Sequence, residues 1–152
     1  MLWLTMAAKW IKLNWRQRLV LLEAAYYLIA ARVAIRLLPF RWIVPRLGRV
    51  EETPIERQLS PKEHQQAQGI GWAIAALARH FPLDAKCLTQ AVAGKWMLQR
   101  RGLPSTLYLG IDRGRDEAKW LEAHAWLRCG ADFVTGEGQH ERFRVLTTFT
   151  EE

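Results

Sequence analysis

The sequence predicts an α+β fold, in which helices come first and an antiparallel sheet comes last. Apolar residues recur at helical spacing as far as residue 101, and after Gly102 they give way to short runs separated by polar loops. Half of the 152 residues are apolar and 24% are charged, which is typical of a globular rather than a disordered chain. This length suffices for one core, or for one small domain with a helical appendage.

Residues 14–38 predict one long helix, because Asn14 is a suitable N-cap and neither Gly nor Pro follows it until Pro39. The apolar run at residues 19–31 is shorter than the roughly 20 residues of a membrane span. We therefore expect a buried or interfacial helix here, and a membrane-embedded protein is disfavoured.

Residues 1–50 form a basic helical region, since they carry nine Lys or Arg against the single acid Glu23. The remaining residues carry thirteen basic and fourteen acidic groups and are close to neutral. A basic face of this kind suits an acidic peptide, a partner protein or an anionic membrane surface. It makes nucleic-acid binding by the whole chain a weak interpretation, and we expect no nucleic acid as partner.

Residues 51–59 are polar, contain Pro54 and predict a linker. A second helix is expected to begin at Ser60, because Pro61 suits the first helical position and Glu63 completes a capping box. This helix is expected to end at Pro82.

A third helix is predicted from Asp84 or Ala85 to Arg101, with Gly102 just past its end. Four strands are expected after it, over residues 105–111, 120–128, 132–135 and 142–149. The chain is thus predicted to consist of a basic helical region (1–50), a linker (51–59) and a main domain (60–152).

The only cysteines are Cys87 and Cys129, too few for a disulfide framework or, alone, for a four-ligand zinc site. Neither a CxxC nor an HExxH arrangement occurs. We therefore expect a reducing compartment, the cytoplasm, and neither a metal nor a cofactor. The N-terminus lacks the usual order of a secretory signal, so secretion is not expected.

Cys87 and His124 are the candidates for nucleophilic chemistry. Cys87 falls in the first turn of the third predicted helix, where free N–H groups and a partial positive charge favour a thiolate. His124 lies early in a predicted strand, and papain-like and transglutaminase-like enzymes bring a helix-start thiol and a strand imidazole together. The alternatives are a small core cysteine and a half-exposed sheet histidine.

Several motifs occur in the order found in the lasso-peptide leader peptidases, which the sequence resembles. They are Cys87-Leu-Thr-Gln-Ala91, Leu98-Gln-Arg-Arg-Gly-Leu-Pro104, Leu109-Gly-Ile111 and Ala123-His-Ala-Trp-Leu127, preceded by Arg18-Leu-Val-Leu-Leu-Glu-Ala24 and Leu37-Leu-Pro-Phe40. The resemblance covers nearly the whole chain and is most specific over residues 87–127. It implies a transglutaminase-like cysteine protease domain, with helices packed on an antiparallel sheet.

The resemblance implies an activity and partners. Such peptidases remove the leader from a ribosomally made precursor peptide before an ATP-dependent cyclase closes the macrolactam ring. Cys87 matches the nucleophile and His124 the base. A separate leader-binding protein is implied as a partner, and we expect it to dock partly on the basic helical region. Peripheral membrane contact through residues 14–46 stays open beside it.

The family also places an acidic residue downstream of the histidine, and at this position the sequence departs from the family pattern. Thr135 and Gly136 occupy the position where relatives carry the acid. Asp132 is selected because it is of the family's residue type, although it also fits a plain turn Asp. Glu137 has the better register if residues 130 and 131 form a two-residue turn.

The altered third position keeps two other functions open. One is a non-catalytic peptide-binding module of the same fold, and the other is an acyltransferase or amidase that uses the same Cys87–His124 pair.

Overall fold

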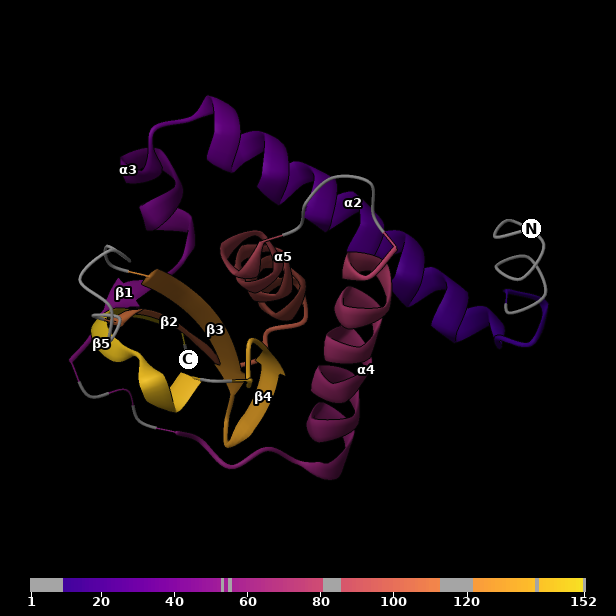
Figure 1. Cartoon of the computed structure of the whole chain (residues 1–152). Coiled ribbons are helices and arrows are strands. Elements are labelled where there is room, and N and C mark those ends of the chain that lie inside the picture. Colours follow the sequence, from indigo (N-terminus) through magenta and orange to yellow (C-terminus); the bar gives the residue numbers. More distant parts are fainter. Residues whose placement is uncertain are drawn as a thin grey trace.

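The structure is a computed structural model that describes residues 10–52, 54, 56–80, 86–112, 122–138 and 140–151 (Figure 1). The described helices are α2 (Trp15–Leu37), α3 (Phe40–Ile43), η1 (Val44–Arg46), α4 (Pro61–Ala78), α5 (Cys87–Arg100) and η2 (His140–Arg142). The strands are β1 (Arg49–Val50), β2 (Ser105–Asp112), β3 (Glu122–Cys129), β4 (Asp132–Thr135) and β5 (Arg144–Glu151). They form one antiparallel sheet in the order β1-β5-β2-β3-β4, which confirms the predicted α+β class.

Helix α2 begins and ends where the sequence predicts. The Asn14 side chain accepts a hydrogen bond from the Gln17 N–H, and the Gln17 side chain accepts one from the Asn14 N–H, so a capping box starts the helix. Leu38 is extended, as expected for a residue before Pro39. Among the described helices, none is both long and apolar enough to cross a membrane.

One face of α2 packs on α4 and α5 and contributes Leu21, Ala24, Leu28 and Ala31 to the hydrophobic core. Figure 1 shows α2 running across α4 and α5 on the side away from the sheet. The Glu23 carboxylate ties α2 to the end of α5, because Arg101 donates to both of its oxygens at 2.8 and 2.6 Å. The basic helical region therefore shares its core with the main domain, and its independence as a unit stays a prediction.

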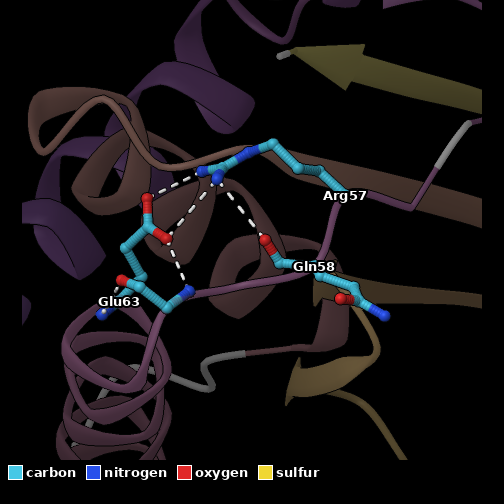
Figure 2. A network of polar contacts seen from close by, with 4 residues as sticks. Arg57, Gln58 and Glu63 are labelled. Carbon is cyan, nitrogen blue, oxygen red and sulfur yellow. Dashed lines mark hydrogen bonds and ion pairs between the residues drawn. The ribbon is translucent and has the colours of Figure 1, made fainter.

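Helix α4 begins at the predicted capping box. The Ser60 side chain accepts from the Glu63 N–H and the Glu63 carboxylate accepts from the Ser60 N–H. Arg57 donates to the same carboxylate at 2.7 Å (Figure 2). The hydrogen bond from Arg57, followed by those from Ser60, lowers the pKa of Glu63 to about 2. The predicted linker is thereby tied to the start of α4. The two residues just before the linker, Arg49 and Val50, form the short strand β1.

Helix α5 lies directly on the sheet, and two residues fix its position. Gly94 approaches Leu127 of β3 so closely that a Cβ at Gly94 would lie 2.7 Å from the Leu127 Cδ2 atom. Lys95 is fully buried, and its Nζ donates to the carbonyls of Ser105 at 2.6 Å and Phe149 at 3.2 Å. The C-terminal half of α5 thus lies at the end of the sheet where β2 begins.

The sheet has two unlike faces, because side chains alternate along each strand. We call the face toward α4 and α5 the inner face; it is apolar and buried, with Leu107, Ala125, Leu127, Cys129 and Phe149 in the main core. The opposite face, the outer face, carries an aromatic cluster of Tyr108, His124, Trp126, Phe133, His140 and Phe143. The Tyr108 and Trp126 rings stack at 5.3 Å across β2 and β3.

Candidate active site

Cys87 is the first residue of α5, in the first helical turn as predicted. The predicted start at Asp84 or Ala85 lies outside the described residues. Lys86 is the N-cap and makes no side-chain hydrogen bond to the helix start. Helix N-termini leave their first N–H groups without intrahelical partners, and the N-cap side chain does not cover them here. The half-buried Cys87 thiol is therefore next to N–H groups of the kind that stabilise an oxyanion.

Cys129 lies in a contrasting environment at the end of β3, fully buried in the main core. Burial, followed by the nearby carboxylates of Asp132 and Glu63, raises the pKa of its thiol to about 11. A thiol with this pKa is protonated at neutral pH and a poor nucleophile. Of the two cysteines, Cys87 is the one with partial solvent exposure and the environment of a nucleophile.

His124 lies on the outer face, paired in register with Gly110 of β2. Its Nε2 atom is 2.9 Å from the Gly136 carbonyl oxygen, and its ring contacts those of Phe143 at 4.9 Å and Trp126 at 5.8 Å. Since a carbonyl only accepts, Nε2 carries the proton in the neutral ring and Nδ1 keeps the lone pair. The imidazole is thus oriented, with Nδ1 as the atom that accepts a proton.

Cys87 and His124 both lie away from the end of the sheet that Lys95 contacts. Starting from the contact between Gly94 and Leu127, Cys87 is about 10 Å back along α5. His124 is about 10 Å from Leu127 along β3, in the direction that leads away from the end of the sheet contacted by Lys95.

They nevertheless lie on different sides of the sheet. Leu127 and Ala125 point to the inner face with α5, so alternation directs His124 and Trp126 to the outer face. Among the residues that the structure describes, no hydrogen bond joins the Cys87 thiol to the His124 imidazole. In this arrangement the nucleophile and its predicted base are not hydrogen-bonded to each other.

The structure does not bring Asp132 to His124. Gly130 and Ala131 form the two-residue turn on which the Glu137 register was conditional. Asp132 pairs with Cys129, about 16 Å from His124 along β3. The Asp132 carboxylate instead forms an ion pair with Nδ1 of His64 on α4. His64 is exposed, and its contact with Asp132 links α4 to β4.

Glu137 is exposed, and its backbone carbonyl accepts from Nδ1 of His140 at 2.7 Å. The group that orients His124 is therefore the backbone carbonyl of Gly136, at the position where the sequence departs from the family pattern. This residue was missed as a functional candidate. Its signal in the sequence is a glycine directly after a strand.

Gly136 is required by its backbone and by its surroundings. Its φ is +74°, a left-handed conformation that favours glycine. A Cβ there would lie 2.6 Å from the Ala125 carbonyl oxygen and 2.8 Å from the Trp126 Cβ. The close approach of Gly136 to β3 is what places its carbonyl against the imidazole.

The described residues contain no group of three or more His, Cys, Asp or Glu that could hold a metal ion. Over residues 34–148 the chain matches the family model Transglut_core3, described as Transglutaminase-like superfamily. Neither the curated proteins nor the solved structures give a significant match.

Proposed function

Because the chain belongs to the transglutaminase-like superfamily, we propose that it is a cysteine peptidase that removes the leader from a ribosomally made lasso precursor peptide. Members of this superfamily are generally cysteine-dependent enzymes. The observation that carries the proposal is the half-exposed Cys87 thiol at the first position of α5, beside N–H groups that the N-cap side chain leaves open.

The proposed reaction is acyl transfer to water through a thioester. His124 accepts the proton of the Cys87 thiol, and the resulting thiolate attacks the carbonyl carbon at the junction of leader and core. The Cys87 backbone N–H stabilises the oxyanion that forms. The peptide C–N bond breaks as the departing amine takes a proton from His124. Water then attacks the thioester as His124 accepts its proton, and the C–S bond breaks. The leader leaves with a free carboxylate, and the Cys87 sulfur takes the proton back from His124.

The His124 step requires a rearrangement. In this structure Nε2 is held by the Gly136 carbonyl on the outer face, whereas Cys87 belongs to the helical layer. Catalytic hydrogen bonds often tighten only when substrate is bound. Here the change must be larger, because strand alternation places His124 on the face opposite α5. We propose that the Gly136 carbonyl, rather than Asp132, sets the imidazole tautomer.

Two partners belong to the proposal: a separate leader-binding protein that presents the precursor, and an ATP-dependent cyclase that consumes the released core peptide. The basic residues before residue 50 suit an acidic docking surface on the first.

The proposal is tested by mass spectrometry of a lasso precursor peptide incubated with the protein and a leader-binding partner. Cys87→Ala is expected to abolish cleavage, a loss of at least about a thousandfold. Cys129→Ala is the matched control, and it is expected to cleave at the same junction as the wild type. Equal cleavage by Cys87→Ala would remove this residue from the mechanism.

The role of His124 is tested separately, by the pH dependence of Cys87 alkylation with iodoacetamide. If His124 acts on Cys87, His124→Gln is expected to shift the alkylation profile to higher pH, because the thiolate loses a cationic neighbour. An unchanged profile together with unchanged cleavage would exclude His124 as the base.

The absence of a Cys87–His124 hydrogen bond within the described residues favours one second candidate, a peptide-binding module of the same fold. Binding of the precursor without cleavage, even with the partner present, would support that function. Transfer of an acyl group from Cys87 to an amine instead of water would indicate an acyltransferase.

A further inference from the structure

Helix α2 carries a second apolar face that no other described part of the chain covers. We call it the α2 stripe; its residues are Trp15, Leu19, Leu22, Tyr26, Ile29, Val33 and Leu37. Their exposed fractions run from 45% for Ile29 to 73% for Leu37. At 1.5 Å per residue the stripe is about 33 Å long, the full length of the helix. Large contiguous apolar surfaces of this kind mark interaction sites.

The stripe lies opposite the face that α2 buries. At 3.6 residues per turn, the exposed set points roughly 180° away from Leu21, Ala24, Leu28 and Ala31. Helix α2 is therefore apolar on two sides, and packing in this fold accounts for only one of them. Tyr26, Ile29, Val33 and Leu37, with Ala30, Ala34 and Leu38, also line an almost wholly apolar hollow of about 450 Å³.

The charges around the stripe have one sign. Arg18 and Arg36 lie along one edge of it on the helical wheel, and Arg41 follows its C-terminal end. Glu23 is the single acid before residue 50, and it is occupied by Arg101. Exposed aromatic rings lie at both ends, with Trp15 at the start and Phe40 and Trp42 beyond the end.

We propose that α2 lies on the surface of an anionic lipid bilayer, with the stripe inserted at the boundary between headgroups and acyl chains. An apolar helix face that carries aromatic residues and is flanked by arginines is the pattern of an interfacial helix. Arg36 at its edge and Arg41 beyond its end pair with lipid phosphates, whereas the Arg18 guanidinium already donates to the Leu13 and Ile11 carbonyls. The apolar hollow accepts part of an acyl chain.

Charge favours the bilayer over a second copy of the chain. Two copies that met through the stripe would bring Arg18, Arg36 and Arg41 of each together, in a protein whose net charge is +7. An anionic lipid surface would instead attract these arginines.

The test is co-sedimentation of the full chain with phosphatidylcholine vesicles that contain or lack phosphatidylglycerol. Wild type is expected to bind the anionic vesicles more strongly, and added salt is expected to weaken this preference. Leu22→Gln with Ile29→Gln is expected to lower the partition coefficient at least about tenfold.

A matched control exists on β5, where Leu146 and Val145 are 62% and 45% exposed, against 57% and 45% for Leu22 and Ile29. Leu146→Gln with Val145→Gln is expected to leave vesicle binding unchanged. Arg36→Gln with Arg41→Gln is expected to abolish the preference for anionic vesicles.

Three outcomes would overturn the proposal. They are no vesicle binding by wild type, equal loss in the stripe and control variants, and a dimer without vesicle binding that the stripe variant dissociates. The last result would assign the stripe to a second copy. None of these outcomes depends on the proposed peptidase, because vesicle binding is measured without precursor peptide.

Discussion

The two faces of the sheet differ in what they can do. The inner face is sealed by α4 and α5 and holds Cys129 and Lys95 away from water, with the thiol pKa raised to about 11 and the ammonium pKa lowered to about 8. The outer face keeps His124 half-exposed among aromatic rings. Position relative to the helices, rather than residue type, therefore decides whether a titratable side chain is buried in the core or available for chemistry.

The largest effect on stability is expected at Gly136, whose carbonyl contacts His124 on the outer face. Gly136→Ala should destabilise the protein by about 3 kcal/mol, since it adds left-handed strain and overlaps the Ala125 carbonyl. Urea unfolding gives the free energy of unfolding. Gly138→Ala is the control, because no atom lies within 4 Å of its Cβ position. Equal stabilities of the two variants would show that Gly136 does not need to be glycine.

The second effect concerns the buried Lys95 on the inner side. Burial lowers its pKa from 10.5 to about 8, against the opposing influence of Glu151 and Cys129. Between these values the unfolded chain binds more protons than the folded one, so stability increases with pH. The penalty for a charged Lys95 is fully present below pH 8, and about 1 kcal/mol of it is expected to disappear between pH 8 and 9.

Above pH 9 the buried thiol acts in the other direction. The Cys129 pKa is raised from 9.0 to about 11, so the folded chain holds this proton longer and stability falls as pH rises through that window. The Lys95 contribution is tested by urea unfolding of Lys95→Met at pH 8 and 9. In this variant the increase in the free energy of unfolding between pH 8 and 9 is expected to disappear. The same increase in Lys95→Met as in wild type would assign it to another group.

A smaller effect on stability is expected for the contact between His64 and Asp132, which is separate from the contact between His124 and Gly136. Asp132→Asn removes the ion pair with His64, and because both side chains are partly exposed the loss is expected to stay below about 1 kcal/mol. His64→Gln should cost a similar amount, and the double variant little more. Precursor cleavage by Asp132→Asn is expected to equal that of wild type. A large loss of cleavage without a loss of stability would restore Asp132 as the orienting residue.

Local signals in the sequence predict the elements well. Asn14 and Ser60 mark the two long helices, because a cap is a contact within four residues. The two-residue turn at Gly130 and Ala131, which the sequence indicates only as a condition for the Glu137 register, is also local. The position of Cys87 in the first turn of its helix follows from the same kind of local pattern.

What the sequence does not predict depends on contacts between distant segments. The Gly136 carbonyl at His124 requires a bulge in the β3–β4 register, and the ion pair between His64 and Asp132 requires α4 to lie on β4. The placement of Cys87 and His124 on different sides follows from which strand face α5 covers. Neither the bulge nor the covered face has a signal within one segment.

The smallest effect compares two glycines of α4 that differ in their distance from the inner face. No atom lies within 4 Å of a Cβ built at Gly69, whereas one at Gly71 would lie 2.8 Å from the Val134 carbonyl oxygen. Gly69→Ala is expected to stabilise the protein by about 0.5–1 kcal/mol, since alanine restricts the unfolded chain and suits a helix interior. Gly71→Ala should destabilise it, because the overlap is with backbone of β4 and not with a flexible side chain. Thermal unfolding of the two variants measures both signs. A gain at both positions would show that α4 can move away from the sheet, and the tight packing that separates the inner from the outer face would then be less rigid than these contacts indicate.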